Sequence, residues 1–152
     1  MRSKIDAVLG NILVIIMSIM VLNVLWQVFT RFVTGNPSSF TDELARYLMI
    51  WIGVLGAAYV SGKNLHVAID ILPTRSNKKT QKWLKAIVTL LVILFVFFAF
   101  VVGGSRLVYI SYVLGQQSPA LQLPLSMVYI IIPISGILIM YYKISDLKKL
   151  LS

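Results

Sequence analysis

The stretch AVLGNILVIIMSIMVLNVLWQVFT, residues 7–30, carries no charged side chain at any position. As a helix it would be roughly 36 Å long, at about 1.5 Å per residue, which is enough to cross the ~30 Å hydrocarbon core of a bilayer with some tilt. The run is too long for the apolar region of a signal peptide, and no small-residue cleavage motif follows it. We therefore predict a retained first membrane helix over residues 7–32, ended by a turn at residues 35–37.

The composition of the whole chain indicates the same class of protein. Of the 152 residues, 59% are hydrophobic and 12% are charged, against about 25% charged residues in soluble domains. A soluble fold would have too few polar side chains to cover its apolar surface. We predict a single all-α integral membrane domain over residues 1–152.

Three further apolar runs have the length of membrane helices. They lie at residues 40–62, 83–114 and 124–142, so that the predicted fold has four transmembrane helices. The last of these contains Pro133, which cannot donate a backbone hydrogen bond to the preceding turn, and a kink is expected there.

The positions of the basic residues predict the orientation of the chain. Of the 14 Lys and Arg residues, all but Arg31, Arg46 and Arg106 fall on one side of the four predicted spans. We expect that side, which includes both termini, to be cytoplasmic. The net charge of +9 is explained in this way, and no nucleic-acid partner is expected because no aromatic side chains alternate with the basic ones.

Residues 63–82, between the second and third helices, mix apolar and basic side chains. We predict an amphipathic segment on the cytoplasmic membrane surface, with Lys78 and Lys79 near anionic lipid headgroups. His66 and Asp70 are four residues apart and can pair on one helical face. A loop histidine without a special role is the alternative, since one histidine and one carboxylate do not form a metal site.

The residues that most catalytic or redox sites require are missing from the chain. It has no cysteine and one histidine, which excludes thiolate metal sites, iron–sulfur clusters and a haem held by two histidines of this chain. The acidic residues all fall at or near span ends, whereas a proton-coupled exporter needs a carboxylate deep in a helix. We expect no enzymatic activity, no cofactor and no transport by this chain alone.

The second helix begins with a cluster of charges in SSFTDELARYLMIWIG, residues 38–53. Arg46 is three and four residues from Glu43 and Asp42, so it can pair with either carboxylate, and the helix N-terminus favours negative charge. Ser39 and Thr41 are candidate N-cap residues.

Arg106 interrupts the third apolar run about 12 Å from its end. A charge inside a span needs a partner, and we expect Arg106 to reach Glu43. The alternative is that the guanidinium snorkels alone to the headgroups.

Small residues recur on the second helix. Gly53, Ala57 and Ser61 are spaced four residues apart, with Gly56 beside them, a pattern that lets another backbone approach closely. The neighbour can be a helix of this chain or of a partner subunit. Gly103 and Gly104 suggest either a similar approach or local flexibility on the third helix.

Residues 40–72, FTDELARYLMIWIGVLGAAYVSGKNLHVAIDIL, resemble the signature region of the small membrane subunits of tripartite ATP-independent periplasmic (TRAP) transporters, the DctQ-type family. The shared features are the acidic pair Asp42-Glu43, Arg46, Trp51 and the His-Val-x-x-Asp element that starts at His66. Phe40 stands where Trp is common in the family. The length and the four-span layout agree as well.

The resemblance implies an accessory subunit in a bacterial inner membrane, bound to a large elevator-type membrane subunit that carries the substrate and sodium sites. A periplasmic binding protein would deliver an organic acid, such as sialic acid. The charge cluster of Asp42, Glu43, Arg46 and Arg106 would help dock that protein, and the small residues Gly53, Gly56, Ala57 and Ser61 would pack within the chain or against the large subunit. A homodimeric proton-coupled exporter and a membrane anchor of an enzyme complex are the alternatives.

Overall fold

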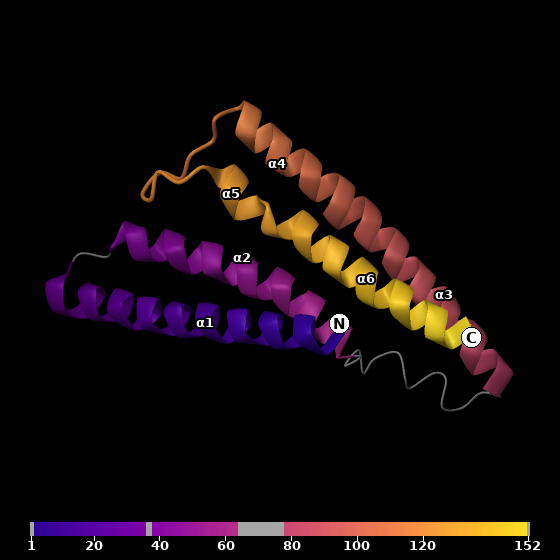
Figure 1. Cartoon of the computed structure of the whole chain (residues 1–152). Helices are drawn as coiled ribbons and strands as arrows, with labels where there is room; N and C mark the ends of the chain where they lie inside the picture. Colours follow the sequence, from indigo (N-terminus) through magenta and orange to yellow (C-terminus); the bar gives the residue numbers. More distant parts are fainter. Residues whose placement is uncertain (1, 36–37, 64–77, 152) are drawn as a thin grey trace.

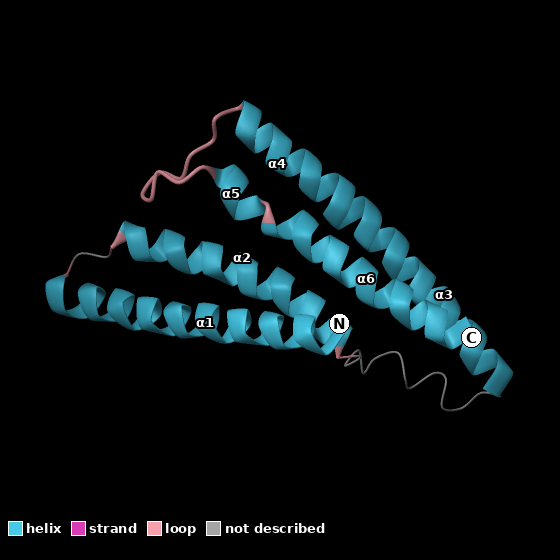
Figure 2. Ribbon diagram, in the orientation of Figure 1, coloured by secondary structure: helices cyan, strands magenta, loops and turns pink. Residues whose placement is uncertain are grey.

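The structure is a computed structural model that describes residues 2–35, 38–63 and 78–151. These residues form helices joined by loops, and no β-strand occurs among them (Figure 2). The helices are α1 (Arg2–Phe29), the π-helical η1 (Thr30–Thr34), α2 (Ser39–Gly62), α3 (Lys78–Val96), the π-helical η4 (Phe97–Gly103), α4 (Gly104–Val113), α5 (Leu125–Tyr129) and α6 (Ile131–Leu151).

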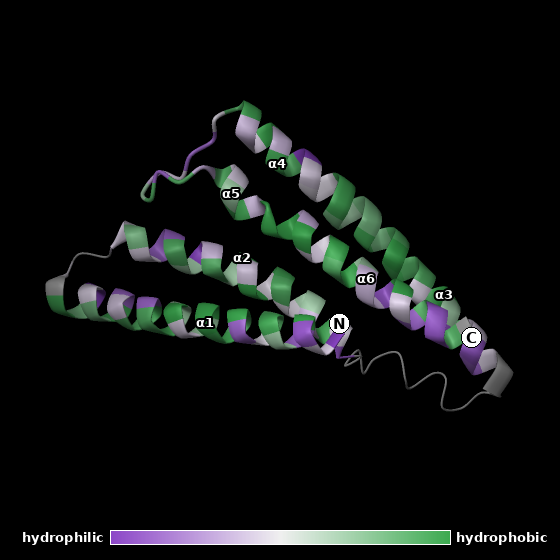
Figure 3. Ribbon diagram, in the orientation of Figure 1, coloured by the Kyte–Doolittle hydropathy of each residue, from purple (hydrophilic) through white to green (hydrophobic). Residues whose placement is uncertain are grey.

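Within the described residues, four helical spans are long and apolar enough to cross a membrane, which confirms the predicted all-α membrane fold. They are Arg2–Val33, Ser39–Gly62, Thr80–Val113 and Leu125–Leu150. Figure 3 shows the long α3–η4 helix as hydrophobic over most of its length, whereas hydrophilic residues lie along α1, at the start of α2 and on α6 towards the C-terminus.

The predicted segment at residues 63–82 lies largely outside the described residues, and so do His66 and Asp70. Lys78 and Lys79 form the first residues of α3. The helix begins five residues before the predicted span, which starts at residue 83. The polar residues that precede the apolar run are part of the same helix.

The helices lie in a row rather than around a common axis (Figure 1). α1 packs on α2, α2 packs on α6, and α6 packs on α3 and η4, while α5 packs on α4. The chain thus consists of two helical hairpins, α1–α2 and α3–α6, which meet where α2 contacts α6. The outer helices of the row, α1 on one side and α3–η4–α4 on the other, leave broad apolar faces uncovered.

At the end of the row that holds both termini, polar contacts join the two hairpins. Arg2 Nη1 donates to Asp146 Oδ1 at 2.5 Å, and Arg2 Nη2 donates to the Gly62 carbonyl at 2.7 Å. The Tyr142 hydroxyl donates to Asp6 Oδ1 at 2.6 Å. We refer to these five residues as the terminal clamp and to this end as the terminal end; the opposite end, with η1 and residues 114–124, is the loop end.

Apolar contacts hold the hairpins together between the two ends. Leu55 of α2 belongs to a buried cluster with Leu9 and Ile16 of α1 and Ile131 of α6. Trp51 of α2 also donates its indole N–H to the Val128 carbonyl of α5 at 3.1 Å. The hairpin interface is therefore packed along its length, although most apolar side chains of the chain face outward.

The predicted kink at Pro133 is present as an interruption between α5 and α6. α5 ends at Tyr129 and α6 begins at Ile131. Pro133 has no N–H to donate to the Tyr129 carbonyl four residues earlier, and its ring clashes with a regular preceding turn. The next bond, from Ile134 N–H to the Ile130 carbonyl, is stretched to 3.5 Å.

The close approach predicted at Gly103 and Gly104 is confirmed at Gly104. A Cβ atom at Gly104 would lie 2.9 Å from Ile132 Cγ2 and 3.1 Å from Pro133 Cδ of the neighbouring helix. A Cβ atom at Gly136 would lie 2.8 Å from Phe100 Cβ. The second hairpin thus depends on glycine at its helix contact.

Gly104→Ala is therefore expected to destabilise the isolated chain by about 1–3 kcal/mol, the usual cost of overpacking. Gly53→Ala is the matched control, because no described residue lies within 4 Å of a Cβ at Gly53 and alanine favours the helix. Thermal unfolding in detergent, followed by circular dichroism, measures both. Equal midpoints for the two variants would contradict the close contact at Gly104.

Candidate functional site

The charged cluster predicted from the sequence lies at the loop end, at the start of α2. Asn23 of α1, which is 8% exposed, donates its side-chain N–H to the Thr41 carbonyl at 2.7 Å. This buried bond fixes the start of α2 against α1.

The N-cap prediction was wrong. Ser38 occupies the cap position without a side-chain cap bond, and α2 begins at Ser39. The Thr41 hydroxyl donates to the Ser38 carbonyl at 2.8 Å. Thr41 is buried inside the first turn, so its hydroxyl bonds to the preceding carbonyl and does not accept from a backbone N–H.

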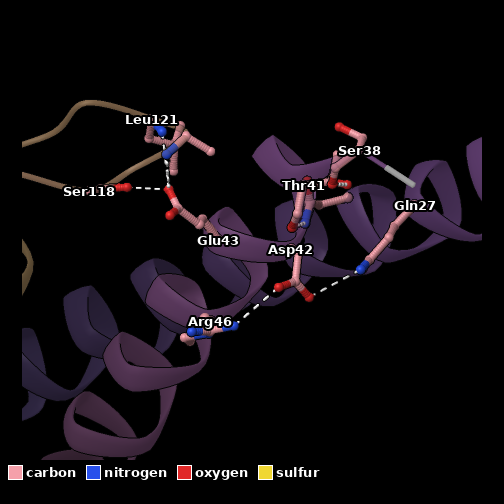
Figure 4. Close-up of polar contacts among 10 residues, drawn as sticks. Gln27, Ser38, Thr41, Asp42, Glu43, Arg46, Ser118 and Leu121 are labelled. Carbon is pink, nitrogen blue, oxygen red and sulfur yellow. Dashed lines mark hydrogen bonds and ion pairs between the residues drawn. The ribbon is translucent and has the colours of Figure 1, made fainter. Parts of the chain in front are cut away.

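Asp42 and Arg46 form the ion pair that their spacing predicts. Arg46 Nη2 lies 3.1 Å from Asp42 Oδ2, with side chains 66% and 57% exposed. Gln27 of α1 donates to the other Asp42 oxygen at 3.3 Å (Figure 4). The pair is an exposed feature of the α1–α2 hairpin.

Glu43 points away from Asp42 and contacts the loop between α4 and α5 (Figure 4). One carboxylate oxygen accepts hydrogen bonds from the Ser118 hydroxyl, from the Ala120 N–H at 3.1 Å and from the Leu121 N–H at 3.0 Å. We call this set of contacts the Glu43 latch. It joins the two hairpins at the loop end, as the terminal clamp does at the other end.

The loop folds in a way that presents these donors. Gly115, at φ +57°, ends α4 in the left-handed conformation, and Gln122 has φ +52°. The Ser118 N–H donates to the Leu123 carbonyl and the Gln122 N–H to the Ser118 carbonyl, both at 2.9 Å. Successive backbone N–H groups in such a turn form a concavity that favours an anion. Residues 114–124 carry no charge of their own, so this loop compensates Glu43 through one hydroxyl and two backbone N–H groups.

The expected contact between Arg106 and Glu43 is not formed. Arg106 is exposed on α4, and it has no ion pair within residues 2–35, 38–63 and 78–151. The reason is the order of the helices: α5 and α6 separate α4 from α2 (Figure 1). Arg106 therefore does not belong to the charge cluster.

A groove of about 580 Å³ lies beside the Asp42–Arg46 pair. Its walls include Gln27, Arg31, Ser39 and Asp42. Sequence reasoning did not include Arg31, although its place directly after the first apolar run, on the same side as Asp42, was a signal for it. We call Gln27, Arg31, Ser39, Asp42 and Arg46 the corner surface. Its polar and charged groups suit contact with a polar partner.

The small residues of α2 divide between two environments. Among residues 2–35, 38–63 and 78–151, nothing lies within 4 Å of a Cβ placed at Gly53 or Gly56, and Ala57 is exposed. Ser61, by contrast, is fully buried, and its hydroxyl has no hydrogen-bond partner among the described residues. Only the last member of the predicted stripe therefore packs inside the chain.

An apolar groove of about 400 Å³ runs between α1 and α2 on the side of Gly53 and Gly56. Met49 and Ile52 lie in its wall and share a helical face with the two glycines through their three- and four-residue spacing. We call the groove and Gly53, Gly56 and Ala57 the α1–α2 face. The remaining residues of the groove are Met17, Met20, Val21, Val24 and Leu25.

The part of the chain that the structure describes holds no group of three or more His, Asp or Glu residues that could bind a metal ion. At the loop end, the corner surface offers charged and hydrogen-bonding side chains to a binding partner.

Comparison with known proteins places the chain in a family. Residues 20–152 match the model of the DctQ component of tripartite ATP-independent periplasmic transporters. A putative TRAP transporter small permease protein of Haemophilus influenzae is 28% identical over 124 residues, which cover 82% of this chain and 75% of the relative.

Two further relatives match shorter segments. The sialic acid TRAP transporter permease protein SiaT of H. influenzae is 34% identical over 71 residues, 47% of this chain and 12% of SiaT. The sialic acid TRAP transporter small permease protein SiaQ of Vibrio cholerae is 30% identical over 56 residues, 37% of this chain and 32% of SiaQ. Since the family model covers most of its length, the chain belongs to the DctQ family and is a small permease component of a TRAP transporter, not an enzyme.

Proposed function

We propose that the chain is the fixed accessory subunit of a sodium-coupled transporter that imports an organic acid into a bacterium. It would lie in the inner membrane, brace a large elevator-type membrane subunit and help to dock a periplasmic binding protein. The observation that carries this proposal is the membership of the DctQ family, together with the positions of the described carboxylates. All of them lie at the terminal end or the loop end, so none is available in the middle of a span to couple ions to transport.

The relatives support two parts of this proposal: a larger membrane subunit as partner, and an organic acid as substrate. The segment of SiaT that resembles this chain makes up only 12% of that permease, so most of SiaT has no counterpart here. Sialic acid, named for SiaT and SiaQ, is a carboxylate. We propose an organic acid of this kind as the substrate, with its binding site and the sodium sites on the large subunit.

The proposal as a whole is tested by uptake in cells that contain the binding protein and the large subunit, with and without this chain. Sodium-dependent uptake of sialic acid or of another organic acid is expected only when the chain is present. Uptake at the full rate without the chain would overturn the accessory role. Transport by the chain alone in liposomes would instead support the exporter.

We assign the α1–α2 face to the large subunit. In lipid, helices associate through close packing rather than hydrophobicity, and small residues allow that packing. Within the described residues a Cβ atom at Gly53 or Gly56 would meet no neighbour, and Ala57 is exposed. The neighbouring methionines provide an adaptable apolar surface. A transmembrane helix of the large subunit can therefore lie along α2 and fill the groove.

The double variant Gly53→Leu/Gly56→Leu is expected to keep the stability of the isolated chain, because both positions are open. It should lose most co-purification with the large subunit, since the added side chains prevent close approach. Pull-down from detergent-solubilised membranes measures this loss. Val113→Leu, at a 61% exposed position on α4, enlarges a side chain by one methylene group outside the α1–α2 face and should bind normally. Retention of the large subunit by the double variant would contradict the assignment.

We assign docking of the binding protein to the corner surface. With both termini in the cytoplasm, as the distribution of Lys and Arg predicts, the loop end faces the periplasm. Arg31, Asp42 and Arg46 are exposed there and can meet complementary charges on a soluble partner. Glu43 is excluded from this role because its carboxylate is occupied in the latch.

Asp42→Lys is expected to reduce uptake several-fold at limiting binding protein, because charges at the rim of an interface act mainly on the association rate. Saturating binding protein should restore most of the rate. Lys148→Glu, a charge reversal at the terminal end, should have little effect in the same assay. An equal loss in both variants, or a loss that saturation leaves unchanged, would argue against docking at Asp42.

Glu43→Ala and Asp42→Ala separate the latch from the corner surface. Glu43→Ala removes the shared acceptor of three donors in the loop, so it should lower the thermal midpoint of the isolated chain clearly and loosen residues 114–124. Asp42→Ala breaks an exposed ion pair, which typically contributes about 0.2–1 kcal/mol. Melting curves and proteolysis of the loop compare the two; similar midpoints would show that the latch is not structural.

A further inference from the structure

The outer helix formed by α3, η4 and α4 has a continuous exposed face. Along this helix, exposed side chains recur every three or four residues, a spacing that places them on one face. Arg106 is exposed and falls within the same series. The other members are Leu91 (59% exposed), Phe95 (65%), Phe98 (62%), Val102 (49%), Tyr109 (67%) and Val113 (61%). We call this set the edge stripe; Arg106 is its one charged member.

The described carboxylates at the loop end are engaged by other groups. Asp42 pairs with Arg46, and Glu43 is held in the latch. Arg106 has no ion pair within the described part of the chain. A guanidinium on an apolar membrane helix without a counter-charge is costly, so the counter-charge must come from outside these residues.

The length of the uncharged run places Arg106 at a definite depth. Lys85 and Arg106 bracket residues 86–105. As a helix this run is roughly 30 Å long, which is about the thickness of the hydrocarbon core. With Lys85 at the boundary of the terminal end, Arg106 falls at the boundary between hydrocarbon and headgroups at the loop end, and the last turns of α4 extend beyond it.

The aromatic residues agree with this depth. Trp83 is 66% exposed just before Lys85, and Tyr109 and Tyr112 are 67% and 75% exposed just after Arg106. Exposed Trp and Tyr side chains are enriched at both membrane–water boundaries, where the ring meets hydrocarbon and the polar group meets headgroups. The exposed aromatic residues therefore indicate the same two membrane–water boundaries as Lys85 and Arg106.

We propose that Arg106 and Tyr109 bind the phosphate of a phospholipid in the leaflet at the loop end. A guanidinium can donate two parallel hydrogen bonds to phosphate oxygens. Tyr109 lies one turn further towards the headgroups on the same face and supplies a hydroxyl donor. Val102 and Phe98 continue the edge stripe towards the middle of the span and provide an apolar path for an acyl chain. This site is independent of the α1–α2 face and of the corner surface.

A phosphate accounts for these observations better than a carboxylate on a helix of another subunit. A partner carboxylate would satisfy the charge, but it would not account for a depth that matches the headgroup boundary or for the exposed tyrosines beyond it. The edge stripe also carries large side chains, including Phe95 and Phe98, in contrast to the small residues of the α1–α2 face.

Native mass spectrometry of the purified full chain tests the site with two added lipids. Phosphatidylglycerol, which has the phosphate, is expected to remain bound, whereas diacylglycerol, which lacks it, is not. Arg106→Gln should weaken phosphatidylglycerol binding by about tenfold, the effect of losing one charge-assisted bidentate contact. Arg106→Lys should fall between the wild type and Arg106→Gln, because an ammonium is not bidentate. Tyr109→Phe should lose less than Arg106→Gln.

Arg46→Gln is the matched control, since it removes one guanidinium at the same end that is already paired with Asp42; it should bind phosphatidylglycerol as the wild type does. Equal binding by Arg106→Gln and the wild type would overturn the proposal, as would equal losses in Arg106→Gln and Arg46→Gln. Loss of the large subunit from Arg106→Gln with unchanged lipid binding would also overturn it and would assign Arg106 to a carboxylate of that subunit.

Discussion

Polar contacts at the two ends of the row hold the hairpins in register, and the exposed surfaces depend on this register. In lipid there is little hydrophobic force to bring two apolar hairpins together. The terminal clamp and the Glu43 latch supply directional bonds between them, with the charged groups located where the spans end. Between these ends Leu55 fills the interface, and Trp51 adds a hydrogen bond to the Val128 carbonyl. The ionic groups therefore lie at the ends of the spans, where charge in the membrane is least costly, and apolar packing holds the middle of the interface together.

A row of four helices leaves more surface than a closed bundle, and the surfaces differ in chemistry. The α1–α2 face combines bare glycines with methionines, whereas the edge stripe carries phenylalanines, a tyrosine and Arg106. The first is suited to a neighbouring backbone, and the second to lipid acyl chains and headgroups. The proposed accessory role uses both surfaces, one to contact the large subunit and the other to contact the bilayer.

The fold could be predicted because its determinants are local. Apolar run lengths define the four spans, the missing N–H of Pro133 explains the interruption before α6, and the four-residue spacing gives the Asp42–Arg46 pair. The partners of Glu43 could not be predicted in this way. They are a hydroxyl and two backbone N–H groups in a loop without charge, and backbone donors leave no sign in a sequence. The Arg2–Asp146 contact joins residues 144 positions apart, a distance at which no spacing rule applies.

The wrong prediction of an Arg106–Glu43 contact and the unpredicted partners of Glu43 have one physical origin. The sequence analysis matched an unpaired positive charge with an acidic pair at a similar depth, but depth alone does not determine which helices are neighbours. Asp42 and Glu43 are adjacent in an α-helix of 3.6 residues per turn, so their side chains point about 100° apart. One carboxylate therefore faces α1 and Arg46, and the other faces the second hairpin (Figure 4). The acidic pair thus joins two functions in adjacent residues: Glu43 fixes the position of α2 in the row, and this position in turn orients Asp42 on the corner surface.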